Sequence, residues 1–181
     1  MGINSKIELR KYIEEDEKRY HPVRFPLKSL LYPKNYYLEY LRCLRKAEYY
    51  CNVGGGVIKY YYLHKLHRLG VLTGIDIPIN VVGKGLFIPH GKVVISHLAS
   101  IGECCTIYSD VTIGIDGVEE TEAATIGNNV IIGTGARIIG NVKIADGVVI
   151  GANAVVCKDI LEQNAVVVGI PSRIVKYRGA L

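Results

Sequence analysis

The stretch IGNNVIIGTGARIIGNVKIADGVVIGANAVVCKDI, residues 126–160, repeats one pattern every six residues. Isoleucine or valine occupies positions 95, 101, 107, 113, 126, 132, 138, 144, 150 and 156, and a small or β-branched residue stands two positions before each. A helix repeats about every 3.6 residues and a strand about every two. A period of six therefore predicts flat sides joined by turns into stacked coils, whose inward aliphatic residues form one continuous core.

The repeat is interrupted twice. One residue too many lies around Pro89-His90-Gly91, and Ile113 and Ile126 are separated by thirteen positions. A regular solenoid needs neither break, and interruptions of a regular fold often carry function. A β-solenoid that serves only as a scaffold would explain the repeat equally well.

Residues 1–73 lack the six-residue period and are predicted to form a small N-terminal α-helical region, and residues 74–181 to form the β-helix domain. Ser5 can cap a helix over residues 5–20, because Glu8 follows it at capping-box spacing.

Two more helices are expected over residues 34–50 and 57–69, separated by consecutive glycines. Gly70 is the expected C-cap of the second. The segment HPVRFPLKSLLYP, residues 21–33, contains three prolines and is expected to be irregular.

Charge divides unevenly between the two regions. Residues 1–73 hold 14 Lys and Arg against 7 Asp and Glu, a net charge of +7, and residues 74–181 have a net charge of −2. Most tyrosines lie in the basic region. This mixture fits either a solvated helical face over packed tyrosines or a peripheral contact with an anionic membrane surface. Nucleic-acid binding is not expected, because no glycine-rich or zinc module of that kind accompanies the basic region.

Other features favour a cytoplasmic protein. No apolar run is long enough to span a bilayer, and the N-terminus has no apolar core of a secretory signal. The five cysteines have no metal-ligand spacing and are interpreted as reduced thiols.

Four segments carry a family resemblance: GIDIPINVVGKGLFIPHG, IGECCTIYSDVTIG, the stretch quoted at the outset, and GIPSRIV at residues 169–175. With them, residues 74–178 resemble the hexapeptide-repeat acyltransferases, in their serine O-acetyltransferase-like branch. The N-terminal YLEYLRCLRKAEYYCN resembles the helical leader of capsule and exopolysaccharide O-acetyltransferases. The resemblance implies a left-handed parallel β-helix, acetyl-CoA as donor without a metal, and a homotrimer with active sites between subunits.

His90 ends the word GLFIPH and matches the family's catalytic histidine. A hydroxyl is a poor nucleophile, and an imidazole that titrates near neutral pH can take its proton during attack on a thioester. By resemblance, Asp76 is the candidate that orients His90, although its spacing differs by one residue from the family pattern. His97 is interpreted as structural. His64 and His67 lack a third metal ligand, and His21 lies in the leader with them.

The resemblance also places the donor. Backbone groups of Thr134 and Ala152 are expected to contact the pantetheine of acetyl-CoA. Cys157 and Lys158 occupy a turn that usually reads Thr-Lys in the family. Two further cations are expected to meet the phosphates, namely Arg173 and Lys176.

Two departures concern the acceptor. Serine-specific members carry an Arg-His pair at the end of the extended loop, where this chain has EETEAAT, and an aspartate where it has Pro89. We therefore expect a saccharide hydroxyl as acceptor, in surface polysaccharide synthesis. Serine O-acetylation for cysteine biosynthesis and a non-catalytic trimeric scaffold are the alternatives. The loop carboxylates either accept hydrogen bonds from sugar hydroxyls or are simply solvated; they are Asp116, Glu119, Glu120 and Glu122.

Overall fold

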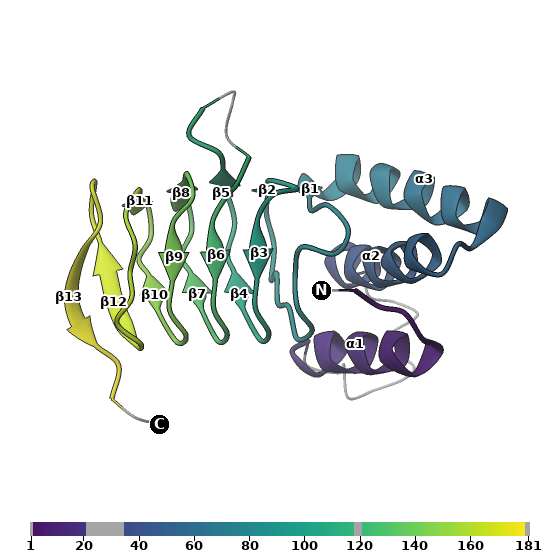
Figure 1. The fold of residues 1–181 in the computed structure, drawn as a ribbon, viewed down its shortest axis with the longest axis horizontal. Coiled ribbons are helices and arrows are strands. Elements are labelled where there is room, and N and C mark those ends of the chain that lie inside the picture. The colour runs from purple at the N-terminus through teal and green to yellow at the C-terminus, as the bar shows by residue number, and fades with distance from the viewer. Residues whose placement is uncertain (1, 21–34, 118–120, 180–181) are drawn as a thin grey trace.

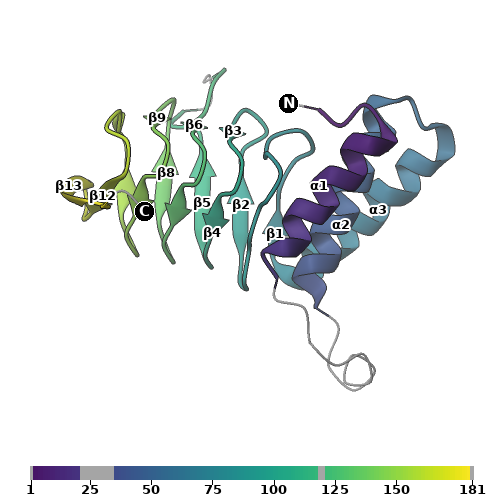
Figure 2. The ribbon, with the colours of Figure 1, turned by 90° about the horizontal axis from the view of Figure 1, so that it is seen from below.

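A computed structural model describes residues 2–20, 35–117 and 121–179, and shows a helical region at one end of a parallel β-helix (Figure 1). The helices are α1 (Lys6–Lys18), α2 (Tyr36–Asn52) and α3 (Gly56–Thr73). Figure 2 shows all three stacked against the first coil. The predicted irregular segment 21–33, His21, Glu119 and Glu120 lie outside the described residues.

The β-helix is built from very short strands. In chain order these are β1 (Ile75–Asp76), β2 (Val93–Ile95), β3 (Ser100–Ile101), β4 (Thr106–Ile107), β5 (Val111–Gly114), β6 (Thr125–Ile126), β7 (Ile131–Ile132), β8 (Arg137–Ile139), β9 (Lys143–Ile144), β10 (Val149–Ile150), β11 (Val155–Val156), β12 (Ala165–Val168) and β13 (Arg173–Tyr177).

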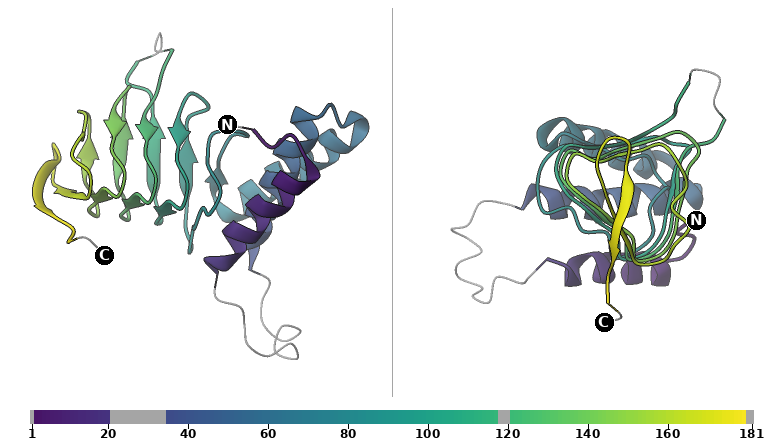
Figure 3. Two further views of the ribbon diagram at one scale, coloured as in Figure 1. Left: turned by 60° about the horizontal axis from the view of Figure 1, so that its bottom comes forward. Right: turned by 90° about the vertical axis from the view of Figure 1, so that its left-hand side faces the viewer.

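Three sheets form the sides of the β-helix. Their strand orders are β1-β2-β5-β8-β11, β13-β12-β10-β7-β4 and β3-β6-β9. From β2 to β11, consecutive strands therefore fall on successive sides. Neighbouring strands within each sheet pair in parallel, apart from the antiparallel pair of β12 and β13. Seen along the axis in the right-hand view of Figure 3, the coils superimpose around one three-sided cross-section.

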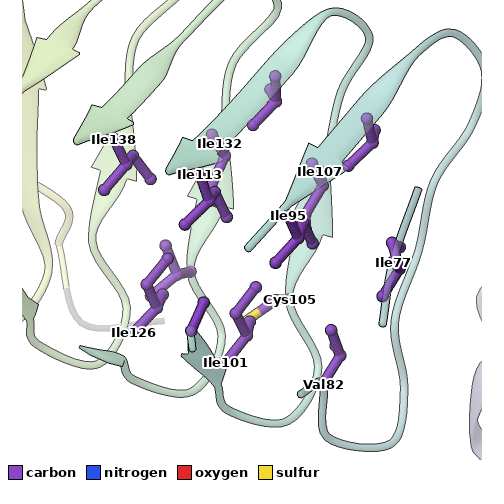
Figure 4. Packing of buried hydrophobic residues seen from close by; sticks show 14 of the residues in the cluster. Ile77, Val82, Ile95, Ile101, Cys105, Ile107, Ile113, Ile126, Ile132 and Ile138 are labelled. Atoms are coloured by element: carbon purple, nitrogen blue, oxygen red, sulfur yellow. The ribbon is translucent and has the colours of Figure 1, made fainter. Parts of the chain in front are cut away.

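The six-residue pattern is confirmed as the core of the β-helix. Every aliphatic residue of the repeat from position 95 to position 156 is at most 3% exposed. Figure 4 shows these side chains stacked inside the coils, with Ile95, Ile113 and Ile138 in line on one side. Stacking is needed for burial, because a single coil would leave its inner face open to water.

The loop after β5 projects from one corner of the coil (Figures 1 and 3). Its return is anchored by the buried Ala123 and Ala124, and the amide of Asn141 donates a hydrogen bond to the carboxylate of Glu122.

The predicted helix starts fit better than the ends. Ser5 and Glu8 form the expected capping box of α1. The prediction that the third helix ends at Gly70 was wrong, because α3 continues to Thr73 and Gly74 is its left-handed C-cap, with φ of 73°. Gly70 serves close packing instead. A Cβ there would lie 2.8 Å from the carbonyl oxygen of Ile75.

A buried cation joins the helices to the first coil. Arg45 of α2 is fully buried and pairs with Asp16 at 2.8 Å and with Glu48 at 3.1 Å. Its guanidinium also donates to the carbonyl oxygens of Val82 and Gly83. Burial alone would lower the pKa of Arg45, but the two carboxylates together raise it. The group is therefore charged and fully hydrogen-bonded.

The carboxylates of this cluster bind the coil as well. Asp16 accepts the N–H of Leu86 at 2.9 Å, and Glu48 accepts the N–H of Asn80 at 2.9 Å. The cluster thus satisfies backbone groups of the first coil that have no preceding coil to bind.

Candidate active site

His90 lies in the turn that leads from the isolated bridge at Phe87 into β2, and it is exposed. The extra residue of the repeat is accommodated at this turn. Gly91 has φ of 89°, and a Cβ on it would lie 2.1 Å from the Cβ of Ser109 in the next coil. Only glycine fits there, so the chain next to His90 packs directly onto the following coil.

Turns stack above one another at this corner of the β-helix, which we call the His90 corner (residues 89–92, 108–110, 133–136 and 151–154). Backbone hydrogen bonds connect them coil by coil. The N–H of Asp110 donates to the carbonyl oxygen of Lys92 at 2.6 Å. In the same way, the N–H of Gly135 donates to the carbonyl oxygen of Ser109 at 2.9 Å, and that of Asn153 to the carbonyl oxygen of Thr134 at 2.8 Å. His90 and the candidate pantetheine contacts at 134 and 152 therefore share one edge of the molecule.

Thr134 and Ala152 are exposed at the His90 corner. Within the described ranges, the backbone N–H groups of these two residues donate to no protein acceptor, whereas the N–H groups on either side of each do. Two free donors on successive coils, beside small side chains, suit a thin chain with carbonyl groups that lies along the edge.

Tyr20 holds the His90 turn from the side of the helices. Its hydroxyl donates to the carbonyl oxygen of Ile88 at 2.7 Å and accepts the N–H of the same residue at 3.1 Å. Its ring packs edge-on against Phe87, with centroids 4.9 Å apart. Burial raises the pKa of Tyr20, so the phenol is neutral. Nothing in the sequence signals this contact, because it depends on how α1 docks.

Asp76 does not reach His90 through any interaction of the described residues. It is exposed on β1, one coil before Val94 in the same sheet. No hydrogen bond or ion pair in that part of the chain joins the two side chains.

The remaining predicted donor-binding residues lie elsewhere. Cys157 and Lys158 are exposed in the turn after β11, at the corner from which the loop after β5 also leaves; we call it the loop corner. Arg173 and Lys176 are exposed on β13, at the last coil. Within one chain, the residues predicted to bind the donor therefore lie at two corners of the β-helix and at its C-terminal end.

A carboxylate and a guanidinium that the sequence did not single out form an ion pair at the His90 corner. Arg137 on β8 pairs with Asp110 of the His90 corner at 3.4 Å and also donates to its carbonyl oxygen. The two residues come from adjacent coils, so a knowledge of the coil register could have brought them together.

Part of the β-helix matches a known family of transferases. Residues 123–158 match the bacterial transferase hexapeptide (six repeats). Over this part of its length the chain is similar to the hexapeptide-repeat transferases.

Relatives of this hexapeptide-repeat chain are named serine acetyltransferases. That of Synechococcus elongatus is 41% identical over 116 residues, which are 62% of this chain and 47% of the relative. The Neisseria gonorrhoeae structure has 27% identity and a TM-score of 0.77 over 98% of this chain and 70% of its own. A Brucella abortus structure in complex with coenzyme A has 26% identity and a TM-score of 0.71 over 96% and 68%. The chain spans about half the length of the curated relatives that it matches.

Two of the five cysteines of this chain are poor candidates for a nucleophile because they are buried. Cys105 fills an inward position and is buried, which raises its pKa to about 11. Burial also raises the pKa of Cys43 to about 11. A thiol with such a pKa is protonated at neutral pH and is a poor nucleophile.

The other histidines that the structure describes lie away from the His90 corner. His97 is exposed after β2, and His64 and His67 are exposed on α3. Among the residues that the structure describes, no three His, Cys, Asp or Glu side chains gather in a way that could hold a metal ion. In the same residues, no helix has the length and apolar character to cross a membrane.

Proposed function

We propose that the chain transfers an acetyl group from acetyl-CoA to a hydroxyl at the His90 corner. The observation that carries this proposal is the stacking of His90 with Thr134 and Ala152 along one edge. The match of residues 123–158 to the bacterial transferase hexapeptide and the likeness to a coenzyme A complex support it.

In this proposal His90 acts as general base. Its imidazole takes the proton of the acceptor hydroxyl while the oxygen attacks the thioester carbonyl carbon. The resulting imidazolium then returns that proton to the sulfur of coenzyme A as the C–S bond breaks. General-base help of this kind contributes about 10²–10⁴-fold in rate. The free N–H groups of the corner would hold the pantetheine parallel to the edge.

We infer serine as the acceptor, because the relatives are named serine acetyltransferases. The relatives named above thus favour the alternative of serine over the expectation of a saccharide in polysaccharide synthesis. A saccharide hydroxyl stays the second candidate for one reason. The loop residues 119–125 read EETEAAT, and no Arg or His there could pair with the carboxylate of serine.

We also propose a left-handed winding and a homotrimer, as the resemblance implies. The His90 corner precedes the strands of the β1-β2-β5-β8-β11 sheet, and the loop corner follows them. The width of the sheet therefore separates the two corners within one chain. A three-fold assembly that places the His90 corner of one subunit against the loop corner of the next would complete the donor site with Cys157 and Lys158. We also propose that the protein is located in the cytoplasm.

A thiol-release assay with acetyl-CoA tests the function. Serine, nucleotide sugars and oligosaccharides are offered separately as acceptors. We expect release with serine. Release with a saccharide alone would favour the second candidate, and failure to bind acetyl-CoA would favour a scaffold.

A further inference from the structure

The outward face of α3 is unusually apolar for a helix on a protein surface. Its exposed large hydrophobic residues are Val57 at 84%, Val71 at 74%, Tyr60 at 64%, Tyr61 at 61%, Leu72 at 60% and Ile58 at 50%. Helix α2 lies between α3 and α1 (Figure 1), so α3 uses its opposite side, with Leu66 and Leu69, for packing. Apolar surface that gathers on one element usually marks a binding site.

The charge of this face has one sign. No Asp or Glu occurs from residue 49 to residue 75, whereas α3 carries Lys59, Lys65 and Arg68. Lys65 is already paired with Glu39 of α2, at 3.1 Å. Arg68 is exposed on the outward face next to His64 and His67. The partner of this face must therefore be apolar and anionic.

An open hollow of about 700 Å³ lies at the last two turns of α3. Its lining combines cationic and apolar groups, from Lys65, His67, Arg68, Leu69, Val71 and Leu72. A phosphate-bearing headgroup with the start of an acyl chain has the same combination of chemistry.

We propose that the outward face of α3 binds the surface of an anionic lipid bilayer. The tyrosines and aliphatic residues enter the headgroup region, and Arg68 meets the anionic headgroups. A second copy of this chain fits less well. A two-fold contact would bring the same face of two chains together. Arg68, His64 and His67 would then face the same three residues of the second chain, with no acidic partner.

This proposal is independent of the acetyl-transfer function. The face belongs to α3, whereas the His90 corner is formed by turns of the β-helix. Acetyl transfer measured without lipid is therefore expected to be the same in α3 variants and in the unaltered protein.

Co-sedimentation with vesicles tests the proposal. The vesicles consist of phosphatidylcholine alone or of phosphatidylcholine with phosphatidylserine. The test variant is Arg68→Gln with Leu72→Ser. The matched control is Lys11→Gln with Ile7→Ser on α1, which also removes one exposed cation and one exposed apolar side chain four residues apart.

We expect the protein to sediment with the phosphatidylserine vesicles only, and less as salt rises. The partition coefficient of the α3 variant should fall at least about five-fold, which is what the loss of one cation near an anionic surface costs. The partition coefficient of the α1 control should stay the same. Equal binding to both kinds of vesicle, equal loss in both variants, or no binding at all would overturn the proposal. It would also fail if sedimentation velocity showed that the α3 substitutions abolish self-association instead.

Discussion

Tyr20 and Gly91 hold the turn of His90 from two sides. The tyrosine clamps both backbone groups of Ile88. The glycine lets the turn pack on Ser109 without a Cβ in the way. His90 itself is exposed, and among the described residues its side chain has no hydrogen bond or ion pair, so its chemical role can be tested separately from its surroundings.

Replacement of His90 tests the base directly. His90→Ala should lower kcat by about 10²–10⁴-fold, because the acceptor proton loses its base. Folding and acetyl-CoA binding should be kept, as measured by circular dichroism and calorimetry. His97→Ala, at another exposed histidine, is the control and should retain its activity. Near-normal turnover of His90→Ala would mean that another group takes the proton.

Tyr20 is a positioning residue by this geometry. Tyr20→Phe keeps the ring against Phe87 but removes the hydroxyl that binds Ile88. We expect kcat to fall by up to about a hundred-fold as His90 shifts, with little change in the KM for acetyl-CoA. Steady-state kinetics beside the exposed control Tyr61→Phe would measure this. A lowered melting temperature with unchanged kcat would show that Tyr20 only stabilises the fold.

At the scale of elements, α1 and α2 reach the first coil through one ionic cluster. Arg45 connects Asp16, Glu48 and two carbonyl oxygens of the coil. The sequence predicted the helices themselves, from the Ser5 cap and the glycine interruptions. It could not predict this docking, because Asp16 and Arg45 are far apart in the chain and resemble ordinary solvated helix residues.

Loss of the buried cation should be costly. Arg45→Met leaves two buried carboxylates without a counter-charge, and we expect a loss of about 3–5 kcal/mol in the free energy of unfolding. Arg10→Met removes an ion pair whose side chains are 83% and 52% exposed, and should cost less than ~1 kcal/mol. Urea denaturation of both variants measures the difference. Equal effects would mean that the cluster contributes no more than a surface pair.

The pH dependence of Arg45→Met has a defined sign. Burial already raises the pKa of Glu48, against the opposing pull of Arg45. Without Arg45 that pKa rises further, so the folded state binds more protons than the unfolded state. Stability of the variant should therefore increase as pH falls from neutral toward 5. The unaltered protein should respond in the same direction but less steeply, because Arg45 opposes the rise in the pKa of Glu48. Urea titrations at several pH values measure both responses, and equal responses would contradict this reasoning.

At the scale of the whole molecule, the six-residue register was readable because it repeats. Ile95, Ile113 and Ile138 could be assigned to one core from their spacing alone, and the structure stacks them as expected. The proposed donor site was only partly readable. Thr134 and Ala152 align with Gly91, the residue next to His90, but Cys157 and Lys158 fall on another corner because a three-sided coil turns between them.

Mixed oligomers test whether two chains share a site. His90→Ala and Lys158→Ala subunits are each expected to have low activity. When they are co-expressed with different tags and purified as mixed trimers, about one third of the sites should combine an intact His90 with an intact Lys158, because each mixed ring has one such interface in three. Activity above that of either parent is the expected result. Simple averaging of the two parents would mean that each site lies within one chain.

The last strand has a consequence for how the chain behaves in a crowded solution. A parallel coil ends in a row of open backbone groups, on which another molecule could continue the stack indefinitely. Here β13 turns back and covers β12 in the antiparallel direction, with a shift in register between Val166 and Val167. Its exposed Arg173 and Lys176 repel an identical end. The solenoid is thereby given a finite length and protected from growing into fibres.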